Sequence, residues 1–419
     1  MFAQKEMRVW CGILFMSFCL CLVPRGGLAD SYPVKIYIDA DWSGAVVSSQ
    51  SIERGLKTAL EDVGGSLSGH PVELVRMNHR GNARRSLANL KSFLSDNTAL
   101  AVFSGLHSPP LLANRDFINE HQILTFIPWA AAGPITRPEG TENWIFRLSV
   151  DDSKAGAFLV GHAVAVRKLK KPALLLEETG WGKSNQRTML AALKEKGLEP
   201  AGVFWFNWGL NDVSARILLR EIVESGADSV FFVGNAPEGK TFMKSALALG
   251  KEFSLPIISH WGITGGDFPE IITAHKRKSL DLTFLQTKFS FVSQPDDPKG
   301  MRVMETAKRV FPNEIETPLD IAAPTGFIHA YDLGLLLDAA IKQAGGLSGD
   351  IAQDRKAIHD ALEDLQSPVD GLIKTYSKPF SAYSQNSPDA HEALGADDFA
   401  IGRYGLENEV QLYPFTDEP

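Results

Sequence analysis

The sequence predicts an α/β protein with two Rossmann-like lobes, each built on a parallel sheet. Short apolar runs alternate with amphipathic segments along most of the chain from residue 32. Strands separated by single helices pair in parallel, with helices on both faces of the sheet. The alternation forms two series, which start near residues 32 and 151, and turn-rich loops follow most of the apolar runs.

The first residues have the pattern of an export signal. Lys5 and Arg8 precede an apolar run over residues 9–23, which is short for a membrane span but typical of a signal-peptide core. Small residues occupy the cleavage positions at 27–29, so we expect residues 1–29 to be a cleaved signal peptide. Retention of this segment as a membrane anchor is the alternative.

Composition then limits the location and the partners. All three cysteines lie in the expected signal peptide, and a large exported chain without disulfides is typical of the bacterial periplasm. The net charge of −8 becomes more negative without the signal, since that segment carries three basic residues and one acidic residue. Acidic and basic residues are interspersed, which makes nucleic acid an unexpected partner. No later apolar run is long enough to cross a membrane.

The first series predicts alternating strands and helices. Val34, Ile36 and Ile38 alternate with Lys35, Tyr37 and Asp39, which is the period of a strand. A helix follows, with apolar residues at helical spacing over 52–63, and the glycines at 64 and 65 end it. The remaining elements of this series are a strand at 72–77, a helix at 84–94, a strand at 101–104, a helix from 108 and a strand at 123–127.

The second series repeats this order of strands and helices. After residue 280 the regular alternation of short strands and helices ends. Helical spacing over 155–166 precedes a buried type of strand at 172–176. Further strands are expected at 203–206, 229–233 and 256–259, with helices around 189–193, from 212 and around 242–246. Beyond them we expect a long strand at 280–291, helices at 299–310, 319–344 and 351–365, and weak strands at 372–376 and 410–413.

Residues 100–138 offer the first candidate binding surface. Ser108 is expected at a helix N-cap, with Pro109 at the first helical position. The loop after the next strand, over residues 129–134, is rich in alanine and glycine. Loops that leave parallel strands gather at one sheet edge, so a hydroxyl, helix-terminal N–H groups and loop backbone would together receive an anion. Ser108 could instead be only a helix cap, and the adjacent His107, a second candidate, only a loop histidine.

Four tryptophans form the second group of candidate ligand-binding residues. Trp42, Trp129, Trp181 and Trp261 each follow a predicted strand, in loops that contain glycine or alanine. One such tryptophan is usually an anchor of local packing. Four at strand ends favour a cleft that buries an apolar or flat ligand.

Motifs of catalysis and cofactor binding are absent from the sequence. It has no dinucleotide or Walker-type glycine loop, no His-Glu-x-x-His and no Gly-x-Ser-x-Gly. Adjacent acids such as Glu177-Glu178 are expected to be solvated or capping. Binding is therefore favoured over catalysis, and we expect no metal and no cofactor.

Several short motifs occur in a fixed order along the chain. They are Trp42-Ser43-Gly44, Gly64-Gly65, Gly105-Leu106-His107-Ser108, Pro128 with its Ala-Gly loop, Trp144-Ile145-Phe146-Arg147 leading to Asp152 and Gly156, Glu178-Thr179-Gly180-Trp181-Gly182, Asn211-Asp212, Pro237-Glu238 and Ala330-Tyr331-Asp332. This ordered set resembles type I periplasmic binding proteins of the branched-chain amino acid class, the substrate-binding components of ABC importers. The resemblance covers nearly all of residues 33–419.

The resemblance implies two lobes joined by crossover strands, which close on a ligand by a hinge. It implies a first lobe of residues 30–149 and 278–365, and a second of residues 150–277 and 366–419. The site would lie between them. Ser108 and the loop of Trp129, Ala130 and Ala131 would hold a ligand carboxylate, Trp181 would cover the ligand, and Asn235 would face the cleft.

Two departures from the family bear on the ligand. Alanines at 130–132 replace a threonine, and Trp261 stands near the place of the acid that meets a ligand ammonium. A buried ammonium without a partner is costly, so a branched-chain amino acid would need Asp41 or Glu238 to supply the charge. Amides, urea-like compounds and aromatic or aliphatic carboxylates are comparable candidates.

We therefore expect a periplasmic, monomeric solute-binding protein that serves an ABC permease in the inner membrane. The alternative is a ligand-sensing receptor that feeds a membrane signalling partner, with the same fold and pocket. An enzyme on this fold is the third class, and it would turn over the bound compound.

Overall fold

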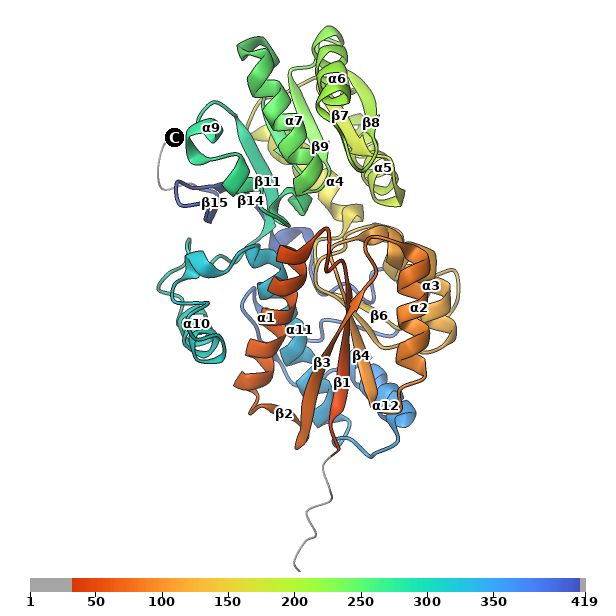
Figure 1. Cartoon of the computed structure of the whole chain (residues 1–419). Coiled ribbons are helices and arrows are strands. Elements are labelled where there is room, and N and C mark those ends of the chain that lie inside the picture. Colours follow the sequence, from red (N-terminus) through yellow and green to blue (C-terminus); the bar gives the residue numbers. More distant parts are fainter. Residues whose placement is uncertain (1–31, 415–419) are drawn as a thin grey trace, which may run out of the picture. The chain divides into compact units, whose positions relative to one another are not determined.

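The computed structural model describes residues 32–414. The expected signal peptide, residues 1–29, lies outside the described residues. Two large sheets form the framework (Figure 1), which confirms the predicted α/β class. Within the described chain, no helix is both long and apolar enough to cross a membrane.

The first sheet has six strands in the order β2-β3-β1-β4-β5-β6 and is parallel except for the β2–β3 pair. Its central strand β4 is buried along its whole length, as expected for a parallel strand covered on both faces. The strands are β1 (Val34–Ala40), β2 (Ser66–Leu67), β3 (His70–Asn78), β4 (Ala99–Ser104), β5 (Thr125–Ile127) and β6 (Ile145–Arg147).

Helices cover both faces of this sheet. In Figure 1 α1 and α11 lie on one side of the strands, with α2 and α3 on the other. Gly55 permits the close packing of α1 on α11, since a Cβ there would lie 2.1 Å from the carbonyl oxygen of Phe327. The helices of this region are α1 (Val46–Asp62), α2 (Ala83–Leu94), α3 (Ser108–Glu120), α10 (Pro298–Val310), α11 (Pro324–Gln343) and α12 (Ile351–Glu363).

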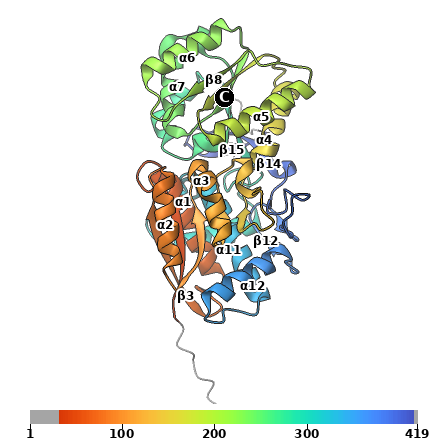
Figure 2. The ribbon, with the colours of Figure 1, turned by 90° about the vertical axis from the view of Figure 1, so that its right-hand side faces the viewer.

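The second sheet has seven strands in the order β15-β14-β11-β10-β9-β7-β8. Strands β7 to β11 run parallel, whereas β14 and β15 are antiparallel additions at one edge. The strands are β7 (Pro172–Glu177), β8 (Gly202–Phe206), β9 (Ser229–Val233), β10 (Ile257–Ser259), β11 (Leu282–Thr287), β14 (Phe399–Tyr404) and β15 (Val410–Leu412). The helices are α4 (Asp152–Ala165), α5 (Gly180–Glu195), α6 (Asp212–Glu224), α7 (Ala236–Leu249), α8 (Phe268–Ile271) and α9 (Ala274–Arg277). Figure 2 shows α4 to α7 from a second side.

Two segments lie elsewhere than the expected lobe boundaries place them. The stretch from residue 278 was expected in the first lobe, but β11 pairs with β10 in the second sheet. The tail from residue 366 was expected in the second lobe. Its first two strands, β12 (Val369–Asp370) and β13 (Thr375–Tyr376), instead lie against α11 of the first lobe. There the Tyr376 hydroxyl donates to Asp332 Oδ2 at 2.7 Å. Only β14 and β15 of the tail join the second sheet. Local periodicity predicts a strand but cannot say which sheet receives it.

The start of α3 differs by one residue from the prediction. His107, not Ser108, is the N-cap, and its side chain makes no capping hydrogen bond. The Ser108 hydroxyl instead accepts a hydrogen bond from the Ala132 N–H at 3.2 Å. The prediction of Ser108 as the N-cap is therefore wrong, because the helix already begins at Ser108 and its hydroxyl contacts a neighbouring loop.

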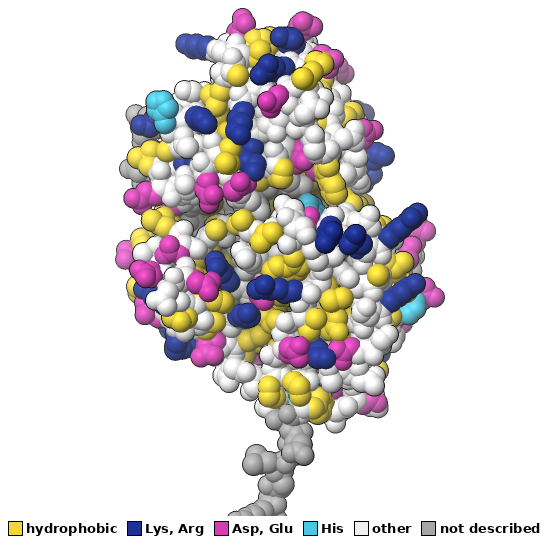
Figure 3. All heavy atoms as spheres, viewed as in Figure 1, with side chains coloured by type: hydrophobic (Ala, Val, Ile, Leu, Met, Phe, Trp, Pro, Cys, Tyr) yellow, Lys and Arg dark blue, Asp and Glu magenta, His cyan; other side chains and the backbone are white. Residues whose placement is uncertain are grey.

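The surface carries charges of both signs. Figure 3 shows Lys and Arg side chains interspersed with Asp and Glu on the face in view, which agrees with the mixed charge pattern of the sequence.

Candidate ligand-binding site

Loops from the carboxyl ends of strands in both sheets meet around a small cavity of about 10 Å³. From the first sheet come the loops after β4 and β5, and from the second the loops after β7, β9 and β10. The cavity is lined by Leu106, His107, Ser108, Pro109, Trp129, Ala131, Glu177, Trp181, Asn235, Trp261 and Gly262. An adjoining cavity of about 210 Å³ shares three of these residues and continues past Trp208 and Glu238.

Seven of the nine candidate residues line this cavity, namely His107, Ser108, Trp129, Ala131, Trp181, Asn235 and Trp261. Ala130 is buried beside it, with its carbonyl oxygen accepting from the Ser149 hydroxyl at 3.2 Å. Trp42 lies away from it, contrary to our expectation. The Trp42 indole donates to the Ile38 carbonyl at 3.3 Å, and the Arg76 guanidinium lies over its ring at 4.7 Å, so it anchors local packing.

The cavity wall has hydrogen-bond donors that the protein itself does not use. The indole nitrogens of Trp129 and Trp181 are buried and have no partner among the described residues. A buried donor without an acceptor costs about 1–3 kcal/mol. An oxygen acceptor placed beside these nitrogens would recover that cost.

Two buried histidines hold the tryptophan loops in place. His260 Nδ1 accepts from the Trp261 N–H at 3.0 Å, and its Nε2 lies 2.9 Å from Asp152 Oδ1. His329 bridges the Pro128 carbonyl and the Thr287 hydroxyl at 2.8 and 3.0 Å, while burial lowers the pKa of His329 to about 4.

The rings themselves also make contacts. Those of Trp129 and Trp261 lie 6.1 Å apart, and the Trp181 ring meets His260 edge-on at 5.1 Å. These contacts connect loops from both sheets, so the tryptophans act as rigid walls of the cavity.

Glu177 is a cavity residue that the sequence did not reveal. It ends β7, and its side chain is fully buried. Thr179 Oγ1 donates to one carboxylate oxygen at 3.0 Å, and Asn235 Nδ2 donates to the other at 3.1 Å. Burial raises the pKa of Glu177 to about 7, although hydrogen bonding from Trp208 and the nearby His107 oppose that rise. The only sequence signal was an acid at the end of a buried strand, which we interpreted as solvated or capping.

His107 connects the cavity to a second ionisable group. Its Nε2 lies 3.4 Å from Asp41 Oδ2. Burial raises the pKa of Asp41, but hydrogen bonds from His107 and from the N–H groups of Gly44 and Ser43 outweigh it and hold that pKa well below its ordinary value. Asp41 therefore pairs with His107 and does not line the small cavity.

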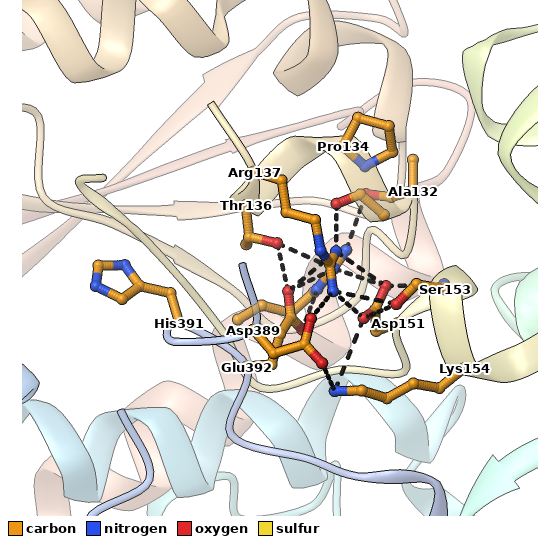
Figure 4. Close-up of polar contacts among 12 residues, drawn as sticks. Ala132, Pro134, Thr136, Arg137, Asp151, Ser153, Lys154, Asp389, His391 and Glu392 are labelled. Atoms are coloured by element: carbon orange, nitrogen blue, oxygen red, sulfur yellow. Dashed lines mark hydrogen bonds and ion pairs between the residues drawn. The ribbon is translucent and has the colours of Figure 1, made fainter. Parts of the chain in front are cut away.

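A buried ionic network ties the first sheet to the tail and to the start of α4 (Figure 4). Arg147, in β6, donates from Nε and Nη2 to the two oxygens of Glu392 at 2.7 and 2.6 Å, and its Nη2 lies 3.0 Å from Asp151 Oδ1. Arg137 donates to Asp151 Oδ2 at 2.5 Å. Burial raises the pKa of Asp151, but Arg147 and Arg137 together lower it to about 2. The network lies where the chain leaves the first sheet.

One group of described residues has the composition of a metal site, namely His359, Glu363 and His391. Its possible ligand atoms lie within 4.8 Å of one another. Protein partners already surround these atoms: His391 lies 3.1 Å from the Ile145 carbonyl and 3.0 Å from Glu363, and His359 lies 3.1 Å from both Asp360 and the Asn143 carbonyl. Hydrogen bonding therefore accounts for the cluster.

Two α/β lobes whose strand-end loops enclose a donor-rich cavity define a solute-binding protein. The chain belongs to the periplasmic binding proteins, since the family model described as "Periplasmic binding protein" matches residues 33–387. It is of the type I class that includes the leucine-binding proteins, as the motifs predicted. Proteins of this class are the solute-binding components of ABC transporters and bind solutes in the periplasm.

Solved structures share the fold at low sequence identity. A type 1 periplasmic binding protein from Bordetella pertussis is 16% identical, with a TM-score of 0.73 over 91% of this chain and all of that one. A Rhodopseudomonas palustris solute-binding protein in complex with benzoate is 19% identical, with a TM-score of 0.73 over 91% and 95%. The leucine-binding protein of Thermotoga maritima is 18% identical, with a TM-score of 0.70 over 90% and 97%. No curated protein matches the chain.

Proposed function

We propose that the protein captures a small amino-acid-like, amide or carboxylate solute between its lobes and delivers it, as a monomer, to an ABC permease in the inner membrane. One observation carries the proposal most directly. Loops from both sheets contribute to a single buried cavity whose tryptophan N–H groups have no partner among the described residues. A solute oxygen is the acceptor that such donors lack.

In this proposal the two lobes have different tasks. The first lobe presents Ser108 and the loop after β5, where the Ala132 N–H already fixes the serine hydroxyl. The second lobe brings Trp181 and Trp261 against that surface. Closure by the hinge excludes water, so the few polar groups act on the solute in a low-dielectric environment.

The test is the affinity of substituted proteins for the solute that mass spectrometry identifies after denaturation of the purified protein. Ser108→Ala and Trp181→Ala are each expected to weaken binding, since both side chains line the cavity. Ser95→Ala, at an exposed position after α2, is the matched control. Unchanged affinity in both cavity variants would refute the site.

The partner needs a separate measurement. Co-purification with an ABC permease would support delivery, whereas co-purification with a membrane sensor would favour the signalling receptor. Chemical alteration of the solute during incubation would instead favour an enzyme.

A further inference from the structure

The adjoining cavity, and not the small one, has room for the bulk of a solute. The small cavity has a volume of about 10 Å³, which is about the least space that holds one water molecule. The adjoining cavity has about 210 Å³, and the two cavities share Leu106, His107 and Asn235. A solute that places one oxygen beside the tryptophans of the small cavity therefore extends into the adjoining cavity.

The wall of the adjoining cavity carries charged side chains of both signs. Its ionisable residues are Asp41, Arg80, His107, Glu238, Lys240 and Asp267. Lys240 pairs with Asp267, and Asp41 pairs with His107. Arg80 and Glu238 remain, and their charges are opposite. The wall therefore has no excess charge that an ionic group of the solute would balance.

Arg80 and Glu238 both keep unused hydrogen-bonding capacity. The Arg80 guanidinium has five N–H donors and makes no hydrogen bond or ion pair with any of the described residues. Glu238 is buried and accepts at Oε1 from the Gly209 N–H at 3.0 Å, whereas a carboxylate can accept about four hydrogen bonds. A hydrocarbon group in this cavity would remove water from both side chains without replacing its hydrogen bonds, which is costly.

The backbone conformation of Arg80 is an independent sign of function. Residues 79–82 form a turn in which the Asn82 N–H donates to the His79 carbonyl at 2.8 Å, with φ of +51° at Arg80 and +68° at Gly81. Turns with positive φ at both central positions favour Asn, Asp or Gly there. Arginine at this position is strained, and such strain is typical of residues that a binding site holds in place.

We propose that the solute ends, in the adjoining cavity, in an uncharged hydrogen-bonding group such as an amide or a hydroxyl, and that Arg80 donates to it. This inference rests on the proposed function and narrows its solute class to molecules with a polar distal end. Glu177 lies outside this wall, in the small cavity, where Thr179 and Asn235 already donate to it. A branched hydrocarbon end would instead leave Arg80 and Glu238 without water and without a partner.

Three matched pairs of solutes test the distal end. They are asparagine with leucine, succinamate with 4-methylpentanoate, and succinamide with 4-methylpentanamide. Each pair keeps the amino-acid, carboxylate or amide end and the overall shape, and replaces the distal amide by an isopropyl group. Isothermal titration calorimetry at pH 7 gives the affinities for the full mature protein, for Arg80→Asn and for the control Gln122→Asn. Gln122 is exposed, also has a positive φ, of +54°, and lines neither cavity.

We expect at least one amide-ended member to bind the unsubstituted protein about 30-fold more tightly than its partner, since it gains a hydrogen bond from a charged donor. Arg80→Asn should lower that preference about tenfold, and Gln122→Asn should keep it. Neither substitution should lower the midpoint of urea unfolding, because Asn tolerates a positive φ better than Arg or Gln does. A lost preference then reports on the solute and not on the fold.

Equal or tighter binding of the isopropyl members by the unsubstituted protein would overturn the inference and leave the proposed function standing. A preference that Arg80→Asn leaves unchanged would overturn the role of Arg80. If none of the six compounds binds, the solute recovered from the denatured protein decides: an uncharged polar distal end supports the inference, and a hydrocarbon or charged end overturns it. If no solute is recovered either, both the inference and the proposed function fail.

Discussion

Arg147→Met is expected to destabilise the protein more than most single substitutions do. The side chains of Arg147, Glu392 and Asp151 are at most 1% exposed, so removing the cation leaves two buried carboxylates with fewer partners. Removal of one partner from a buried ion pair costs about 3–5 kcal/mol. Arg137 still reaches Asp151 at 2.5 Å and Glu392 at 3.7 Å. We therefore expect the lower end of that range, about 3 kcal/mol.

The assay is urea unfolding at pH 7, followed by circular dichroism and tryptophan fluorescence. Lys308→Met is the control, because Lys308 and Glu305 form an ion pair on the surface, which is worth about 0–1 kcal/mol. The double variant Arg147→Met, Glu392→Met should lose less than the sum of the two single losses, since it buries no unpaired Glu392. A loss for Arg147→Met no larger than that of the control would refute the reasoning.

Three further predictions concern pH, packing and solute release. The pKa of Glu177 is about 7 in the folded state against an ordinary value of 4.5, so between pH 4.5 and pH 7 the folded state binds more protons than the unfolded state. Raising the pH through this range should therefore destabilise the protein by about 3 kcal/mol relative to Glu177→Gln. Parallel pH profiles of the two proteins in thermal melts would contradict this. Gly55→Ala should destabilise by about 1–3 kcal/mol, because its Cβ would clash with the α11 backbone. Gly161→Ala, in the interior of α4, should instead stabilise the protein by up to about 1 kcal/mol, because an added Cβ there would meet no atom within 4 Å. If the two variants shift the midpoint of urea unfolding in the same direction, the packing argument is wrong. Trp208→Ala should speed solute dissociation in stopped flow about tenfold, since its ring lies 5.1 Å from that of His107 and both side chains line the adjoining cavity; an unchanged rate would exclude that role.

The sequence by itself determined the order of most strands and helices and the sheet edge whose loops line the candidate cavity. Apolar periodicity is a local property, and the carboxyl ends of parallel strands converge whatever the loops contain. For that reason Ser108, Trp129, Trp181 and Trp261 could be assigned to one surface before their contacts were known. Trp42 follows a strand as well, but its ring packs under Arg76 and is not among the residues that line the cavity, which the spacing could not show.

Only the tertiary structure decided the electrostatics of the protein. Glu177 and Glu178 are neighbours in the sequence, yet one is buried in the cavity wall and the other is exposed. Arg147 and Glu392 pair across 245 residues, and β11 joins the second sheet through long-range pairing. The energy of a charge depends on its burial and on partners brought in from elsewhere in the chain, and neither is encoded in a local pattern.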